Sequence, residues 1–320
     1  MARKIVFFGG GNAMTKTVLE PLKKYPLDIS SVTSMTDDGG STGQLRQDFD
    51  VLPPGDIRRH ILALSNASEW KKKLWTFRFG HDEFECGHKG HNFANVFLAG
   101  LESSLKDYEK ALDIAHEFME VKGRAYPATV AHTNLCAELE NGKIIEGESE
   151  IDVPKNHDAA LKIKRVFIKP KAKAYPPAVA AIMKADALVI GPGDLYSSTI
   201  PCFLAEGMRE AAGKSKAKKI LVCNLMTKNG ETNGFSVADF AKETEKYIGC
   251  ALDFVIYNTE IPPKTRIAEN KKTDPLVIEP VKIDGALDSK KFIGKNVMTA
   301  KGQILHDPEK LGKLIYSLIQ

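Results

Sequence analysis

The sequence predicts an α/β fold, built on a mostly parallel sheet with helices on both faces and a β-hairpin insertion. The first observation is that short apolar runs of strand length alternate with segments of helical spacing in both halves of the chain. The second is that residues from about 125 to 170 alternate apolar and polar side chains around Asn141-Gly142, a strong hairpin signal. Because strands that alternate with helices pair in parallel, we expect one domain over residues 1–320 that carries this β-rich insertion.

The N-terminal part begins with a βαβ unit. Ile5 to Phe8 is a continuous apolar run, Asn12 to Lys24 has helical spacing, and Ile29 to Met35 predicts a second strand. Apolar spacing then predicts further helices over Pro54 to Ala67, Glu69 to Phe79, Asn92 to Ser103 and Tyr108 to Glu120. Ligands bind at the carboxyl ends of the strands in such sheets, so the turns that follow the strands are the places to search for a site.

The C-terminal part returns to the α/β alternation at Pro176. The predicted elements are a strand over Ala185 to Ile190, a helix over Ile200 to Ala212, a strand over Lys219 to Leu225, a helix over Val237 to Tyr247 and a strand over Asp253 to Tyr257. Thr259 to Thr273 is rich in charge and proline and predicts a mobile or partner-facing loop. Pro308 to Ile319 predicts a closing amphipathic helix.

Composition excludes several classes of protein. The chain has 43% hydrophobic and 27% charged residues, and its apolar runs fall short of the roughly 18 residues of a membrane span. Its five cysteines are widely spaced, which suits a reduced cytoplasm. The formal net charge is +4 and the lysines are scattered, so no basic stripe predicts a nucleic-acid partner. We therefore expect a cytoplasmic protein with neither a membrane nor a nucleic acid as its partner.

The segment Thr36 to Gly43 is the most unusual part of the chain. It combines Asp37 and Asp38 with Gly39, Gly40 and Ser41, and the block Leu52 to Arg59 follows it with Asp56 and Arg58. Glycines let a backbone approach a ligand, and carboxylates hold a metal or a ribose hydroxyl. The alternative is a polar turn that starts a helix. Asp37, Asp38 and Asp56 are the best candidates for chemistry, although no catalytic role follows from the pattern alone.

Three other strand ends carry similar residues, and together they predict one anion site at one sheet edge. Neither the dinucleotide fingerprint nor the phosphate loop of nucleotide hydrolases fits the first turn, because Met14 and Thr15 stand where glycine is needed. His91 and Asn95 share one face of a predicted helix and either bind a ligand or serve as buried capping residues. The residues at these three strand ends are Gly9, Gly10, Gly11 and Asn12; Gly191, Gly193, Asp194 and Tyr196; and Asn224, Met226 and Thr227.

Adjacent carboxylates beside phosphate-binding amides can hold magnesium against a diphosphate. They can equally bind sugar hydroxyls without a metal, so the sequence requires no cofactor and allows magnesium at Asp37 and Asp38. A homodimer is compatible with this fold class, but no surface pattern identifies an interface.

The motifs in this order resemble one family. The segments Gly9-Gly10-Gly11, Asp37 to Ser41, Leu52 to Arg58, Gly90 to Asn95, Gly191 to Tyr196 and Cys223 to Thr227 are similar to the YvcK branch of the CofD/YvcK superfamily, the branch of the gluconeogenesis factors. The resemblance implies a Rossmann-like fold and a cytoplasmic regulatory protein. It further implies binding of UDP-sugars such as UDP-N-acetylglucosamine and a link to central carbon metabolism and cell shape.

The resemblance also implies a set of ligand-binding residues and an alternative activity. The residues are those of the motifs: Gly9 to Asn12, Asp37 to Ser41, Arg58, His91, Asn95, Gly191, Gly193, Asp194, Tyr196, Asn224, Met226 and Thr227. The alternative, from the CofD branch, is a magnesium-dependent transferase that moves a phospholactyl-type group from a nucleotide diphosphate donor to a deazaflavin acceptor.

Overall fold

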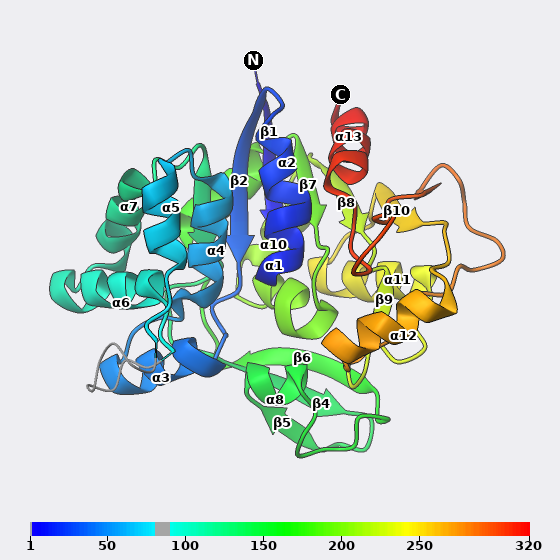
Figure 1. Ribbon diagram of the computed structural model, residues 1–320, viewed down its shortest axis with the longest axis horizontal. Coiled ribbons are helices and arrows are strands. Elements are labelled where there is room, and N and C mark those ends of the chain that lie inside the picture. Colours follow the sequence, from blue (N-terminus) through cyan, green and yellow to red (C-terminus); the bar gives the residue numbers. More distant parts are fainter. Residues whose placement is uncertain (1, 81–89) are drawn as a thin grey trace.

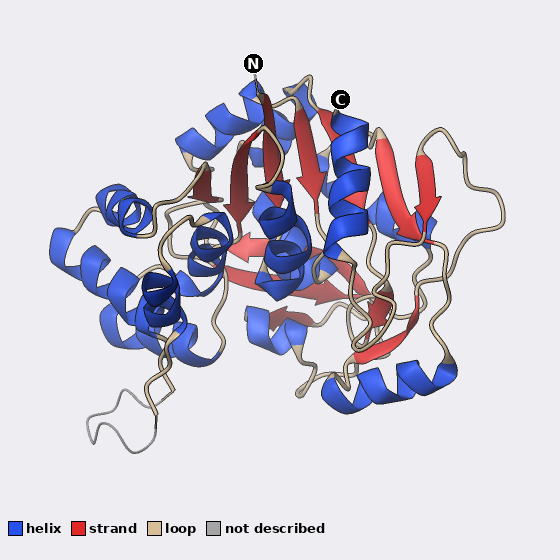
Figure 2. Ribbon diagram, turned by 45° about the horizontal axis from the view of Figure 1, so that its top comes forward, coloured by secondary structure: helices blue, strands red, loops and turns tan. Residues whose placement is uncertain are grey.

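The computed structural model describes residues 2–80 and 90–320, apart from the side chain of Asn12. A parallel sheet of seven strands lies at its centre, with helices on both faces, as Figures 1 and 2 show. This arrangement confirms the predicted fold class. In spatial order the strands are β12 (Phe292–Lys295), β10 (Phe254–Asn258), β8 (Lys218–Val222), β7 (Ala187–Ile190), β1 (Arg3–Phe8), β2 (Leu27–Thr33) and β3 (Arg124–Pro127).

The central strand β1 is apolar on both faces, because it contributes to two cores. Val6 and Phe8 pack into one hydrophobic cluster, and Ile5 and Phe7 pack into the cluster on the opposite face. The first cluster is covered by α9 (Pro176–Lys184), η2 (Leu195–Thr199), η3 (Ile200–Phe203), α10 (Met208–Lys214) and α11 (Val237–Ile248). The second is covered by α1 (Gly11–Met14), η1 (Thr15–Leu19), α2 (Glu20–Leu22), α4 (Pro54–Leu64) and α13 (Pro308–Ile319).

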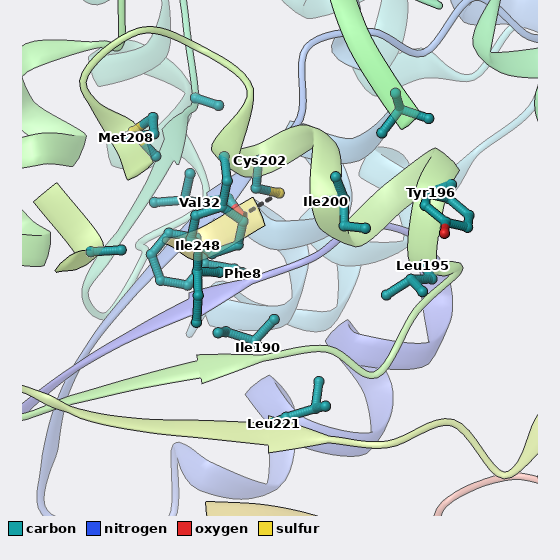
Figure 3. Packing of buried hydrophobic residues seen from close by; sticks show 14 of the residues in the cluster. Phe8, Val32, Ile190, Leu195, Tyr196, Ile200, Cys202, Met208, Leu221 and Ile248 are labelled. Carbon is teal, nitrogen blue, oxygen red and sulfur yellow. Dashed lines mark hydrogen bonds between the residues drawn. The ribbon is translucent and has the colours of Figure 1, made fainter. Parts of the chain in front are cut away.

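The first cluster anchors the segment that follows β7. The rings of Phe8 and Phe203 stack with centroids 4.5 Å apart. The thiol of Cys202 donates to the carbonyl oxygen of Val32 over 3.6 Å, beside Phe8 in Figure 3. A fully buried phenylalanine stabilises the fold by about 1.5–3 kcal/mol. This packing therefore holds η2 and η3 against the ends of β1 and β2.

The predicted hairpin is confirmed. Asn141 and Gly142 join β4 (Asn134–Leu139) to β5 (Ile144–Glu146), and Gly142 has the positive φ of 84° that such turns need. With β6 (Ile163–Lys169) they form an antiparallel sheet beyond the carboxyl ends of the main strands (Figure 1). The helix α8 (Glu148–Asp152) follows β5. The insertion was expected to begin at about residue 125, but the strand at that position, β3, pairs in parallel with β2 and belongs to the main sheet. The inserted sheet therefore begins only at β4.

Two predicted elements were wrong. Residues from Ile200 to Ala212 form no single helix, because Gly207, with a φ of 105°, lies between η3 and α10. The predicted loop over Thr259 to Thr273 contains a helix, α12 (Lys264–Thr273), which begins directly after Pro263. The apolar side chain of Ile267 packs this charged helix against a small cluster.

The remaining elements complete the layers. They are α3 (Gly40–Phe49), α5 (Glu69–Thr76), α6 (Phe93–Leu105), α7 (Tyr108–Phe118) and the two-stranded antiparallel pair β9 (Met226–Lys228) and β11 (Val277–Pro280). The helix α3 begins at Gly40, within the Thr36 to Gly43 segment, where the alternative interpretation expected a polar turn that starts a helix. In the part of the chain that the structure describes, every helix is too short or too polar to cross a membrane.

Candidate functional site

A cleft of about 280 Å³ opens at the carboxyl ends of β1, β7 and β8. The chain leaves β1 toward β2 on one side, and β7 and β8 lie on the other. The cleft is therefore at the point where strand order reverses, which is the usual ligand position in open α/β sheets. The structure brings together in its lining predicted residues from three strand ends: Gly10, Gly11, Gly193, Asp194, Asn224, Met226 and Thr227.

The opposite wall of the cleft comes from α12 and from residues 303–306. Asn270 of α12 accepts a hydrogen bond from the backbone nitrogen of Ile304 over 2.9 Å. The guanidinium of Arg266 donates to the carbonyl oxygens of Thr299 and Gln303, both at 2.8 Å. The segment that was predicted as a loop is thus a fixed part of the cleft.

The first glycine turn is already in contact with a carboxylate of the protein. Asp56, in the first turn of α4, accepts from the backbone nitrogen of Gly11 over 3.1 Å and pairs with Arg59 at 2.5 Å. A Cβ atom on Gly10 would lie only 2.5 Å from an Asp56 oxygen. Asp56 therefore lies behind the cleft and supports its turn, and Gly10 allows this close approach.

The second glycine turn is tied to the third strand end. The Asn224 side chain donates from Nδ2 to the carbonyl oxygen of Gly193 over 2.9 Å. Tyr196 follows this turn, but its ring is buried in the first core cluster (Figure 3) and packs edge-on against Tyr247. The Tyr196 side chain thus packs in the core next to the turn and does not line the cleft.

A buried lysine with three carboxylates is the feature that the sequence did not predict. The Lys228 ammonium contacts Asp152, and it lies 2.9 Å from Asp194 and 3.1 Å from Glu231. Burial lowers the pKa of Lys228, but the carboxylates outweigh it and the pKa is raised overall. Lys228 and Asp194 line the cleft, so the cluster sets the charge of one wall.

Asp37 and Asp38 point to different partners. The Asp38 carboxylate accepts from the backbone nitrogens of Glu148 and Ser149, at 3.1 and 2.8 Å, and so caps α8. Asp37 accepts from the nitrogen of Gly39 over 3.0 Å. Burial, and secondly the nearby Asp56, raise the pKa of Asp37 to about 6. Each Asp38 oxygen thus accepts one backbone hydrogen bond, and magnesium at Asp37 and Asp38 stays a prediction.

Glu148 lies among the acidic residues of this region. Burial raises its pKa to about 10, and Asp37 and Asp152 add to the shift. The carboxyl group therefore holds its proton at neutral pH in the folded protein. In the unfolded chain it is ionised above about pH 4.5, so it reduces the stability of the fold progressively as the pH rises toward 10.

We expect Glu148→Gln to remove this pH dependence, because glutamine copies the shape of the protonated group. The variant should match the wild type near pH 4 and be more stable by about 1–3 kcal/mol near pH 8. Urea unfolding at the two pH values measures the difference. Glu69→Gln is the control, since the Glu69 side chain is 83% exposed. Equal stability of wild type and variant at both pH values would contradict the assignment.

Several of the other predicted residues lie around the start of α3. Ser41 lies 2.9 Å from Nδ1 of His91, and its hydroxyl accepts from Nδ2 of Asn95 over 3.1 Å. Among the described residues, those predicted for the site that do not line the cleft are Gly9, Asp37, Asp38, Asp56, Gly39, Gly40, Ser41, Arg58, His91, Asn95, Gly191 and Tyr196. The side chain of Asn12 lies outside the described part of the chain. The predicted residues therefore lie at the cleft, behind its turns, or around the start of α3.

Residues 5–302 match the family model described as 2-phospho-L-lactate transferase CofD. The chain is 34% identical over 325 residues to the gluconeogenesis factor of Bacillus subtilis, covering 99% of this chain and 98% of that protein. It is 39% identical over 262 residues to the gluconeogenesis factor of Listeria innocua, with 82% and 79% covered. A crystal structure of a UPF0052 family protein from Bacillus halodurans has a TM-score of 0.88 at 33% identity and 99% coverage of both chains. The matched residues include every strand end that lines the cleft.

Proposed function

Because this chain belongs to the CofD family, we propose that it is a regulatory protein that binds a nucleotide sugar of the UDP-N-acetylglucosamine type. The observation that carries the proposal is the cleft in which three polar strand ends meet at the reversal of strand order. The relatives named gluconeogenesis factors support a role in central carbon metabolism. We further propose that the protein acts in the cytoplasm and influences cell shape.

The cleft offers distinct groups for the parts of such a ligand. The glycine turns at Gly10 and Gly193 line the cleft, and we expect their backbone to face the phosphate oxygens. The hydroxyl of Thr227 and the carboxylate of Asp194 suit ribose or sugar hydroxyls. Lys228 lies at the same wall, where its ammonium pairs with Asp152, Asp194 and Glu231. Binding of this ligand needs no metal, and a homodimer stays a prediction.

We expect purified protein to bind UDP-N-acetylglucosamine and to melt at a higher temperature in its presence, since a ligand of the folded state stabilises it by mass action. Calorimetry and thermal shift measure both effects. A matched series with guanosine and adenosine diphosphates tests the preference for uridine. No heat and no shift at roughly millimolar ligand, equivalent to about 4 kcal/mol of binding, would rule out the proposal.

A magnesium-dependent transferase is the second candidate, and one observation favours it. Oxygen atoms of Asp152, Asp194 and Glu231 lie within 4.8 Å of one another at the cleft wall, and magnesium prefers such ligands. The Lys228 ammonium contacts all three carboxylates, so a metal would have to compete with it. The thermal-shift series repeated with magnesium separates the candidates, because only the transferase predicts that magnesium strengthens binding of the diphosphates.

A further inference from the structure

The wall of the cleft that α12 and residues 303–306 form differs in chemistry from the glycine turns opposite it. Val277, which follows α12, and Leu305 line the cleft there, and Leu305 is 45% exposed although it is apolar. A nucleotide sugar extends in two directions from its diphosphate, toward the base and toward the sugar. Because the flat faces of a base pack well on apolar side chains, this wall suits the base when the diphosphate lies at Gly10 and Gly193.

Asn270 provides this wall with one oriented hydrogen-bond donor. The residue is 9% exposed and lines the cleft from α12. Its Oδ1 accepts from the backbone nitrogen of Ile304 over 2.9 Å. Because a backbone N–H only donates, this contact fixes which end of the amide is the oxygen. Nδ2 donates to no group in the part of the chain that the structure describes, so it is left for a ligand.

Thr273 provides an acceptor beside this donor. It lies at the exposed end of α12, lines the cleft, and follows Asn270 by three residues, so the two share one face of the helix. The Thr273 hydroxyl donates to the backbone oxygen of Asn270 over 2.9 Å. A hydroxyl has a single proton, and with that proton used it can only accept from a ligand. The helix thus offers the cleft a neighbouring donor and acceptor.

We propose, on the basis of the nucleotide-sugar function above, that Asn270 and Thr273 select the base. Nδ2 of Asn270 donates to a ring carbonyl oxygen, and the Thr273 hydroxyl accepts from the adjacent ring N–H. Uracil presents this pattern at O4 and N3, and guanine presents it at O6 and N1. Cytosine and adenine present the reverse pattern, an amino donor beside a ring-nitrogen acceptor. Arg266 holds α12 to the carbonyl oxygens of Thr299 and Gln303, so the pair is oriented before the ligand arrives.

Calorimetry of the whole protein with UDP and with CDP tests the proposal, because the two nucleotides differ only at this edge of the ring. UDP should bind about tenfold or more tightly, the equivalent of one or two hydrogen bonds. Asn270→Asp keeps an acceptor for Ile304 and replaces the donor with an oxygen. It should weaken UDP by about tenfold and turn the preference toward CDP, whose amino group can donate to that oxygen. Thr273→Val should weaken UDP and leave CDP unchanged.

Asn141→Asp is the matched control, since Oδ1 of Asn141 also accepts from a backbone nitrogen, that of Lys143 at 3.0 Å, in the hairpin of the inserted sheet. It should keep the affinity and the preference of the wild type. Thr273→Val decides if Asn270→Asp does not fold, because the Thr273 side chain is at an exposed helix end.

Equal affinity of the wild type for UDP and CDP would overturn the selection of the base and leave the nucleotide-sugar proposal standing. A preference for UDP that is unchanged in Asn270→Asp and Thr273→Val would also overturn it, since other groups would then read the base. If neither nucleotide binds, both proposals are wrong.

Discussion

Lys228→Met is expected to destabilise the fold by about 3–5 kcal/mol at neutral pH, because it leaves buried carboxylates without their cation. Methionine keeps the apolar stem, so the loss is one of charge. Glu231 cannot move away, since it also accepts from the backbone nitrogen of Tyr196 and from the Ser197 hydroxyl, at 2.8 and 2.9 Å. Urea unfolding of variant and wild type measures the difference.

The pH dependence of this loss gives a second check. The pKa of Lys228 is raised in the folded state, so its stabilising effect is fully present below the ordinary lysine value of 10.5 and is lost only above it. Burial raises the pKa of Asp194 to about 6, so below that pH this carboxyl group gains a proton and no longer needs the ammonium. The deficit of Lys228→Met should therefore be smaller near pH 4.5 than near pH 8.

Lys246→Met is the matched control, because Lys246 also forms an i,i+3 ion pair, with Glu243. The Lys246 side chain is 47% exposed, whereas that of Lys228 is buried. We expect it to cost less than about 1 kcal/mol. An equal loss in the two variants would mean that the buried cluster contributes no more than a surface pair. A deficit that grew as the pH fell would contradict the proposed role of the carboxylates.

Sequence patterns identified the sheet because its signals are local. The apolar run at Ile5 to Phe8 and the Asn141-Gly142 turn each act within a few residues, and both predictions are confirmed. The glycine turn at Gly193 was predicted for the cleft for the same reason. The residues of each strand and turn determine the local backbone conformation. The parallel arrangement of the strands then brings their carboxyl ends to one edge of the sheet.

Other features depend on contacts between distant segments, which no local pattern reveals. Lys228 and Asp152 are 76 residues apart, and they meet because α8 of the insertion lies beside the end of β9. One local signal for this cluster was present in the sequence. Lys228 and Glu231 are three residues apart and follow a predicted strand, so they could have been expected to pair. The role of Asp38 was hidden in the same way, because its partners belong to α8. The types of side chain therefore indicated that polar contacts form here, but they did not indicate the partner of each side chain.

Gly10→Ala is expected to damage both the fold and the cleft. The added Cβ would lie 2.5 Å from Oδ2 of Asp56 and 3.4 Å from Cβ of Ser198. Asp56 cannot yield freely, since Gly11 and Arg59 hold it. The turn must therefore move, at a cost of about 1–3 kcal/mol for overpacking. Because the same turn lines the cleft, we expect affinity for UDP-N-acetylglucosamine to fall by about tenfold or more.

Gly100→Ala separates this effect from a general effect of alanine. Gly100 lies within α6, and a Cβ there would meet no atom within 4 Å. Alanine is favoured over glycine inside a helix, so this variant should gain about 0.5–1 kcal/mol and bind ligand normally. Unfolding by urea and calorimetry of both variants give the two readings. If Gly10→Ala kept wild-type stability and affinity, the close packing of Asp56 behind the glycine turn would not be what shapes the cleft.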